Sequence, residues 1–356
     1  MHDRSRKFLE RLLASIGPSG YEEQPASVWR EEATSFAATI VRDRHGNTDA
    51  VLNPGGSPRI LLAGHLDEIG FVVTHVEDDG FLRFGTVGKW DLQVVQGQRV
   101  VIRAANGLVR GVIGKKPVHL QKESDRSQVP EVSDLWIDIG VGSREEALSS
   151  IAVGDPVVLD APFVELPGEK AVCRGLDDRG GAFSVLEAGR ILSEMERPPR
   201  AEVHLVATCQ EEIGIRGART SAYRIDPVVA IVVDVTFATD EPGSRSERSA
   251  YGDVKLGGGP VISRGPNIHP RLFSLLVETA QEHGIPYQII AEPGGTGTDA
   301  QEMQVVRGGI ATALVSIPLR YMHTPCEMVS MNDLIRVARL LAHATAAIQD
   351  AEQFIL

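Results

Sequence analysis

One stretch of the chain constrains its fold and function more than any other: an apolar run that ends in two adjacent acids. Residues 203–207 have the pattern of a buried strand, and Glu211 and Glu212 follow shortly after. Adjacent side chains on an extended segment point opposite ways, so the backbone must turn if both acids are to reach one place. Gly214 would help such a turn. The stretch predicts either a solvated corner or a site where one acid holds a metal and the other moves a proton.

The pattern around this stretch predicts an α/β fold. After Pro167, helical and strand-like segments alternate, and the first 66 residues add helices over 8–16 and 22–36 and a buried strand over 59–63. Such alternation indicates a sheet with helices on both faces. The expected helices of the second half are 179–195, 270–283, 298–306 and 331–351, and the expected strands are 202–207, 228–233, 287–290 and 312–316.

The alternation of helices and strands is interrupted between about Gly70 and Asp160. Short strands separated by glycine turns fill the segment, which is typical of a small β-barrel or sandwich. Residues 122–131 contain few apolar side chains and are expected to form an exposed or mobile loop. The simplest organisation is a discontinuous α/β domain, residues 1–69 and 161–356, with a β domain inserted at residues 70–160.

Composition restricts the classes of partner. The chain has 36 Lys and Arg against 48 Asp and Glu, a net charge of −12, which argues against non-specific nucleic-acid binding. No apolar run reaches the roughly 18 residues that a membrane span requires. Three cysteines without a CxxC pattern indicate a reducing compartment. We therefore expect a cytoplasmic protein with no nucleic-acid or membrane partner.

Metal-ligand residue types cluster at the predicted strand ends, where α/β sheets bind their ligands. Divalent ions such as Zn²⁺ take imidazole nitrogen and carboxylate oxygen, and a carboxylate can span two ions about 3.5–4 Å apart. Asp67 lies two residues after a histidine and could accept its second ring N–H, which would fix the tautomer. The candidates from five separate segments are His65, Asp177, Glu211, Glu212, Asp234 and His323.

Each candidate also has a simpler interpretation. Asp177 and Asp178 suit a helix N-terminus, a lone histidine after a strand is usually a polar loop residue, and Asp234 could form a turn. Their joint occurrence at element boundaries favours the metal site. HExxH and G-x-S-x-G motifs are absent, and the glycine-rich segment 294–299 fits a loop lining a pocket better than a nucleotide site. We interpret Cys173, Cys209 and Cys326 as buried packing residues and His119 as a loop histidine.

These motifs resemble one known family, the TET-type dinuclear metallo-aminopeptidases. This is the glutamyl and deblocking aminopeptidase group, some of whose members carry the label cellulase or endoglucanase. The resemblance covers essentially the whole chain and rests on the segments Gly64-His65-Leu66-Asp67-Glu68-Ile69-Gly70, Gly175-Leu176-Asp177-Asp178-Arg179, Gln210-Glu211-Glu212-Ile213-Gly214, Asp234-Val235-Thr236, Gly258-Gly259-Pro260, Arg264-Gly265-Pro266-Asn267 and Arg320-Tyr321-Met322-His323-Thr324-Pro325.

The resemblance implies a role for each residue. His65 and Asp234 would hold one divalent ion, Glu212 and His323 would hold the other, and Asp177 would bridge both. Glu211 would be the general base and acid, and Asp67 would orient His65. Zinc or cobalt would be the ions, with manganese possible, and a hydroxide bridging them would attack the N-terminal peptide bond of short peptides.

The resemblance also implies an architecture. The fold would be a zinc-peptidase-like α/β/α core with an inserted PDZ-like small β-barrel, which usually builds a dimer. Such dimers would assemble into a hollow dodecamer.

Other functions stay open at this point. An N-acyl amino acid deacylase or a carboxypeptidase could use the same metal core. A glycoside hydrolase could use the paired acids without metal. A non-catalytic assembly or binding protein is a further alternative. The preferred N-terminal residue does not follow from the sequence.

Overall fold

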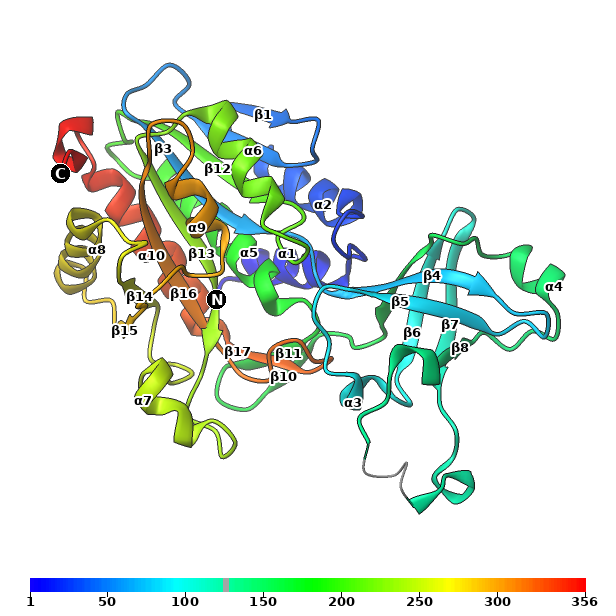
Figure 1. Ribbon diagram of the computed structural model, residues 1–356. Coiled ribbons are helices and arrows are strands. Elements are labelled where there is room, and N and C mark those ends of the chain that lie inside the picture. Colours follow the sequence, from blue (N-terminus) through cyan, green and yellow to red (C-terminus); the bar gives the residue numbers. More distant parts are fainter. Residues whose placement is uncertain (124–127) are drawn as a thin grey trace.

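The computed structural model describes residues 1–123 and 128–356, and Figure 1 shows two parts with different architecture. One part is built on an eight-stranded sheet with helices on both faces, and the other is a β-barrel to its side. The α/β core and the barrel predicted from the sequence are therefore confirmed. The strands of the large sheet, in spatial order, are β1 (Thr39–Arg42), β2 (Thr48–Leu52), β12 (Glu202–Thr208), β3 (Arg59–His65), β13 (Val229–Phe237), β16 (Ala311–Leu319), β14 (Val261–Arg264) and β15 (Gln288–Ala291).

The four central strands of this sheet run parallel. β3 pairs with β12 on one side and with β13 on the other, and β13 pairs with β16. These strands are near-continuous apolar runs because helices cover both faces. Helices α1 (Asp3–Ala14), α5 (Leu176–Ser193) and α10 (Met331–Ala347) pack on one face, and α6 (Arg216–Ile225) and α9 (Asp299–Gln304) pack on the other (Figure 1).

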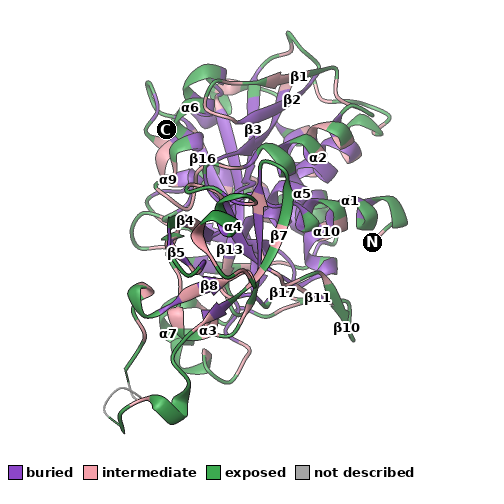
Figure 2. Ribbon diagram, turned by 90° about the vertical axis from the view of Figure 1, so that its right-hand side faces the viewer, coloured by how far each residue is buried: buried purple, intermediate pink, exposed green. Residues whose placement is uncertain are grey.

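Helical spacing of apolar residues docks α1 onto the core. Phe8, Leu9 and Leu12 recur on one face and are fully buried, and the Phe8 ring stacks on Phe183 with centroids 5.6 Å apart. Trp29, in α2 (Glu23–Ala33), is also buried, and its indole N–H donates to a backbone carbonyl 3.0 Å away. In Figure 2 the central strands are mostly buried, and the exposed residues lie mainly in loops and on the outward faces of helices.

The barrel is closed and entirely antiparallel. Its interior is a separate apolar cluster that includes Phe71, Phe84 and Ile137. Phe71 stacks on Trp90 with ring centroids 4.7 Å apart. The strands around the barrel, in spatial order, are β4 (Gly70–Val76), β5 (Leu82–Val87), β8 (Trp136–Asp138), β7 (Gly107–Gly114), β6 (Arg99–Ala104) and β9 (Pro156–Leu159).

Several elements were not expected from the sequence. Helix α6 (RGARTSAYRI) was missed because its buried face consists mainly of small residues rather than large apolar ones, and β14 is only four residues long. A three-stranded sheet of β10 (Val164–Leu166), β11 (Lys170–Cys173) and β17 (Glu327–Ser330) was also missed. The helix expected over 331–351 ends at Ala347. Part of the loop expected over 122–131, residues 124–127, lies outside the described residues.

The remaining elements are short or peripheral. Helix α8 (Pro270–Glu282) packs against β14 and α10. None of the helices in the described ranges has both the length and the apolar character that a membrane span requires. The other helices are α3 (Leu92–Val95), α4 (Arg144–Leu148) and α7 (Arg248–Tyr251), with 3₁₀ turns at Val118–Leu120, Val132–Asp134, Arg245–Glu247 and Ala351–Phe354.

Candidate metal centre

The parallel strands bring the candidate residues to one edge of the sheet. His65 is the last residue of β3 and stands opposite Thr208, the last residue of β12. Asp234 lies on the neighbouring β13. Glu211 and Glu212 follow β12, so the turn that the sequence required is present, and Gln210 at its start has a φ of 57°. The carboxyl ends of adjacent parallel strands therefore gather these side chains in one place.

Asp177 lies between the two histidines. Its Oδ1 is 3.2 Å from His65 Nε2, and its Oδ2 is 3.3 Å from His323 Nε2. The same His323 nitrogen lies 3.2 Å from Glu212 Oε1. Asp177 belongs to α5 as its first turn begins, but its φ and ψ of −80° and 108° are not helical, and the Asp177–Asp178 peptide bond is cis. One carboxylate thus faces both imidazoles.

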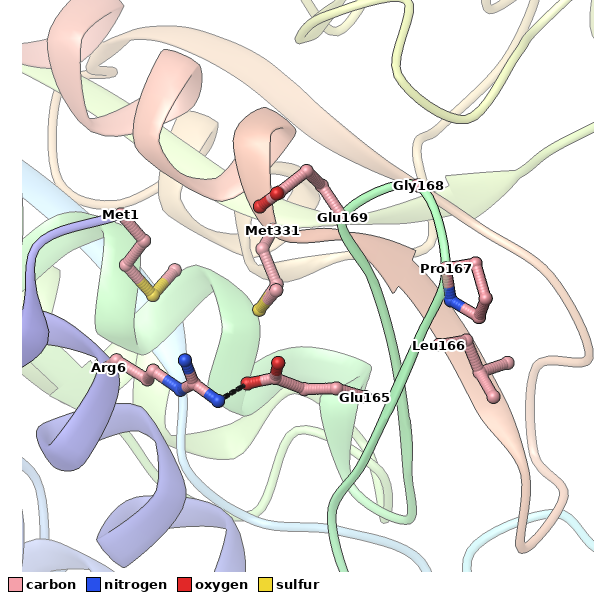
Figure 3. A pocket seen from close by; sticks show the side chains of 8 residues that line it. All are labelled: Met1, Arg6, Glu165, Leu166, Pro167, Gly168, Glu169 and Met331. Atoms are coloured by element: carbon pink, nitrogen blue, oxygen red, sulfur yellow. Dashed lines mark ion pairs between the residues drawn. The ribbon is translucent and has the colours of Figure 1, made fainter.

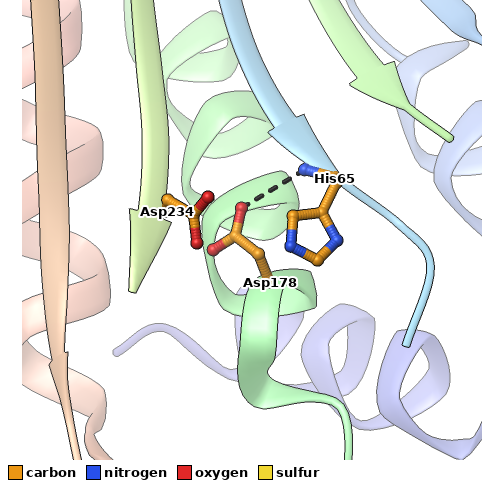
Figure 4. A group of neighbouring side chains, drawn as sticks. All are labelled: His65, Asp178 and Asp234. Atoms are coloured by element: carbon orange, nitrogen blue, oxygen red, sulfur yellow. Dashed lines mark hydrogen bonds between the residues drawn. The ribbon is translucent and has the colours of Figure 1, made fainter. Parts of the chain in front are cut away.

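A second group of donor atoms also includes His65. Figure 4 shows His65, Asp178 and Asp234, whose ligand atoms lie within 4.8 Å of one another. Asp178 already accepts two backbone N–H groups, from His65 at 3.2 Å and from Gly181 at 3.1 Å. Within the residues that the structure describes, Asp234 accepts one hydrogen bond through its side chain, from the N–H of its neighbour Val235 to Oδ1. Asp178 is therefore occupied in holding the backbone, which leaves Asp234 freer to bind an ion.

The donor set fits divalent cations. In a tetrahedral site with bonds of about 2.0 Å, neighbouring donor atoms lie about 3.3 Å apart, close to the separations around Asp177. The histidines also hold the pKa of Asp177 below its usual range through hydrogen bonds, although burial opposes that shift. His65, Asp177 and Glu212 form a further group with ligand atoms within 4.8 Å. These two neighbouring groups, with the Asp177 carboxylate between His65 and His323, match the chemistry of a site for paired ions.

The remaining carboxylates repel one another. Burial, together with the nearby Asp234 and Asp299, raises the pKa of Glu211 to about 10, although His65 opposes the shift. Burial likewise raises the pKa of Glu212 and of Asp178. So many buried acids can ionise together only if positive charge is supplied, which is what divalent ions provide.

Asp67 connects the histidine to the acid pair. It is fully buried, its Oδ1 accepts the Glu211 N–H at 3.1 Å, and its Oδ2 accepts the Glu212 N–H at 3.1 Å and the Ser19 hydroxyl. His65 Nδ1 is 3.5 Å from the Asp67 carboxylate and 3.1 Å from the Asp67 backbone carbonyl. The Oδ1 and the backbone carbonyl oxygen of Asp67 thus both face the His65 ring. The Asp67 carboxylate also fixes the turn that carries the two acids.

Glu327 is a site residue that the sequence reasoning missed. It begins β17 and is buried, its Oε2 accepts the Asp177 N–H at 3.1 Å, and its Oε1 accepts the His323 N–H at 3.1 Å. It lies only four residues after His323 but in no recognisable motif, and β17 itself was not expected. The Glu327 carboxylate is brought to Asp177 and His323 by the short three-stranded sheet, which the sequence did not predict.

The cysteines and His119 stand apart from this chemistry. Cys173 and Cys209 are buried, as predicted, and burial raises the pKa of the Cys173 thiol to about 12. The prediction was wrong for Cys326, which is exposed in the loop between β16 and β17. His119 lies in an exposed 3₁₀ turn of the barrel part.

A cavity of about 840 Å³ opens over the candidate residues. His65, Asp177, Glu211, Glu212, Asp234 and His323 all line it. Thr296, Gly297 and Thr298 also line it, so part of the glycine-rich segment forms the pocket wall that the sequence predicted. A second cavity of about 280 Å³ lies elsewhere, beside Met1 and Met331, and its Arg6 is already paired with Glu165 (Figure 3).

Comparison with known proteins identifies the family. The profile of the M42 glutamyl aminopeptidases matches residues 46–340. The chain belongs to the M42 glutamyl aminopeptidase family. The lysyl aminopeptidase of Pyrococcus furiosus is 35% identical over 337 residues, which cover 94% of this chain and 94% of that protein. Like its family, the M42 chain is a peptide hydrolase of the aminopeptidase class.

Solved structures give the same relationship for this M42 protein. The TET aminopeptidase of a marine sediment Thaumarchaeota archaeon matches it with a TM-score of 0.93 and 35% identity, over 99% of this chain and 100% of that one. The TET1 peptidase of Pyrococcus horikoshii matches with a TM-score of 0.85 and 33% identity, over 97% and 100%. The fold seen here is therefore the TET aminopeptidase fold.

Proposed function

We propose that this M42 protein removes N-terminal residues from short peptides with two divalent ions held at the carboxyl edge of its large sheet. The observation that carries the proposal is Asp177, whose two oxygens face His65 and His323 at 3.2 and 3.3 Å. A single carboxylate placed between two imidazoles is the arrangement that paired ions need.

The ligands divide into two sets on either side of this carboxylate. His65 and Asp234 would hold one ion, and their grouping within 4.8 Å supports that assignment. Glu212 and His323 would hold the other, in line with their 3.2 Å separation. Asp177 would contribute one oxygen to each ion. Zinc, cobalt and manganese all accept this donor set, with zinc and cobalt the first choices.

Glu211 would move the proton. Bound divalent ions would acidify water and polarise the scissile carbonyl. Glu211 lines the same cavity as the proposed ligands, and its backbone is fixed by Asp67. Its carboxylate would accept a proton from the attacking water and return it to the leaving amine. Asp67 would keep His65 and the acid pair in place for this transfer.

We further propose that the β domain at residues 70–160 forms a dimer contact and that such dimers build a dodecamer in the cytoplasm. The Pyrococcus horikoshii relative is described as assembling into a tetrahedron or a large octahedral shell. The barrel also exposes apolar side chains, with Leu108 and Leu120 at 56% and 67% exposure, which a partner subunit would cover. Free cysteines fit a reducing compartment.

One panel of substrates tests the proposed function. Protein stripped of metal by chelation and reloaded with each ion would be assayed on aminoacyl chromogenic substrates. We expect hydrolysis of free-amine substrates and none of their N-acetylated forms, which separates an aminopeptidase from a deacylase. Cleavage from the C-terminal end would indicate a carboxypeptidase instead. Activity on a β-glucan that survives EDTA would contradict the proposal.

A further inference from the structure

Besides the candidate ligands, the cavity is lined by two aromatic residues and one further acid. Phe237 ends β13, Tyr251 ends α7, and their rings meet edge to face with centroids 5.3 Å apart. Both side chains are nearly half exposed, although they line the cavity. Glu292, directly after β15, lines the same cavity. The wall thus combines two open aromatic rings with one carboxylate.

The Glu292 carboxylate is unpaired within the described part of the chain. Its backbone N–H donates to the Arg264 carbonyl at 2.9 Å, but its side chain has no hydrogen bond or ion pair with any residue that the structure describes. The Arg264 guanidinium lies instead over the Phe273 ring, 5.3 Å from its centroid. Burial raises the pKa of Glu292. Because this half-buried carboxylate has no counter-charge among the described residues, it is free to bind a ligand that carries a positive charge.

Glu292 also lies apart from the proposed metal ligands in the sheet. It follows the edge strand β15, and β14 and β16 separate that strand from β13, which carries Asp234. Lys89 lines the cavity too, but it follows Gly88, where an added Cβ would lie 3.5 Å from the Glu212 Cβ. Glu212 comes after β12, and four strands, β3, β13, β16 and β14, lie between β12 and β15 in the sheet. Glu292 is therefore placed to meet the side chain of a bound residue rather than its α-ammonium group.

We propose that Glu292 selects substrates whose N-terminal residue is basic, lysine or arginine. This inference rests on the proposed aminopeptidase function, since it assigns the substrate class of the same cavity. The alkyl stem of the residue would lie along Phe237 and Tyr251, whose ring faces also attract cations. The terminal charge would reach the Glu292 carboxylate, which forms charge-assisted hydrogen bonds with ammonium or guanidinium groups. An acidic side chain would be repelled there.

The test compares selectivity in the wild type, Glu292→Gln and a control, Glu282→Gln. Glu282 is an exposed acid at the end of α8 outside the cavity. The measurement is the ratio of kcat/KM for a lysyl p-nitroanilide to that for a leucyl p-nitroanilide. We expect Glu292→Gln to lower this ratio about tenfold, the effect of losing one partly exposed charged contact. Glu282→Gln should keep the wild-type ratio.

A binding experiment separates the two proposals. L-Lysinamide would be titrated calorimetrically into metal-loaded protein. The comparison ligand would be L-norleucinamide, which has the same α-amino group but an uncharged side chain. The wild type should bind L-lysinamide about tenfold more tightly, and Glu292→Gln should bind both equally. If neither p-nitroanilide nor any other free-amine substrate is cleaved, the proposed function fails, while the titration still decides the role of Glu292. A change of less than about threefold in both the ratio and the binding preference overturns that role.

Discussion

Glu327 offers a sharp test of how the metal centre is held. Its two oxygens accept the backbone N–H groups of Asp177 and His323, each at 3.1 Å, and its own side chain is buried. Glu327→Gln has the same shape but only one acceptor atom. One of the two N–H groups must then face an amide NH₂ group, donor against donor.

The magnitude follows from that loss. A hydrogen bond to a charged acceptor contributes about 1.5–3 kcal/mol, and a buried donor left unpaired costs a similar amount. We therefore expect the substitution to cost about 2 kcal/mol. The affected N–H belongs to Asp177 or His323, which are proposed metal ligands. The loss should therefore displace a ligand and weaken metal binding as well as lower stability. The affinity for divalent ions should drop about 10–100-fold, the usual effect of losing a group that supports a ligand.

The assay measures zinc affinity by competition with a chromogenic chelator, together with urea unfolding of the metal-free protein. The control is Glu302→Gln, which removes a carboxylate from an exposed pair with Arg219. Exposed pairs contribute less than about 1 kcal/mol, so this variant should behave as wild type in both measurements.

The refuting result is specific. If Glu327→Gln binds zinc within twofold of wild type and unfolds at the same urea concentration, Glu327 does not support the two ligands. If it unfolds earlier but keeps its zinc affinity, Glu327 stabilises the fold without positioning the metal centre.

Three further predictions concern the acid pair, the ions and a buried histidine. Glu211→Gln should keep two ions per chain by metal analysis yet lose about 10²–10⁴-fold in turnover, whereas Glu212→Gln should lose an ion; equal metal loss would contradict the division of roles. EDTA should abolish aminopeptidase activity and added zinc or cobalt should restore it, and activity that persists in metal-free protein would rule out the mechanism. His204 contacts Asp49 and Glu202, each at 2.9 Å, and despite burial these contacts raise its pKa above the ordinary 6.5. A raised folded-state pKa adds stability that is complete below pH 6.5 and lost as pH rises through the folded-state value. The stability difference between wild type and His204→Gln should therefore be larger at pH 6 than at pH 9 in urea unfolding, and a constant difference would show that the charge is not involved.

Much of the candidate site could be anticipated because its residues sit at element boundaries. His65 and Glu212 follow compact apolar runs, which mark buried parallel strands, and the ends of such strands meet at one edge. Asp234 follows the same logic, although β13 continues past it to Phe237. The order within the acid pair, Glu211 as base and Glu212 as ligand, came from family resemblance, because spacing alone cannot decide it.

The supporting residues could not be anticipated. Glu327 and Ser19 belong to none of the motifs found in the sequence, and their partners are backbone N–H groups or side chains distant in sequence. Ser19, for example, reaches Asp67 across 48 positions of the chain. Such contacts depend on how loops fold over the sheet edge, and no local periodicity encodes them.

Local pattern and tertiary packing therefore determined different parts of this protein. Apolar periodicity by itself determined the α/β core and the inserted barrel, because burial of apolar side chains imposes those periods on the chain. The acids and histidines that follow the predicted strands determined the chemical type of the site. The tertiary structure alone decided that Asp177 faces both histidines and that Glu327 accepts the N–H groups of Asp177 and His323. It also decided that Glu292 lies on the cavity wall without a side-chain partner among residues 1–123 and 128–356. Distances between segments far apart in sequence follow only from the completed packing.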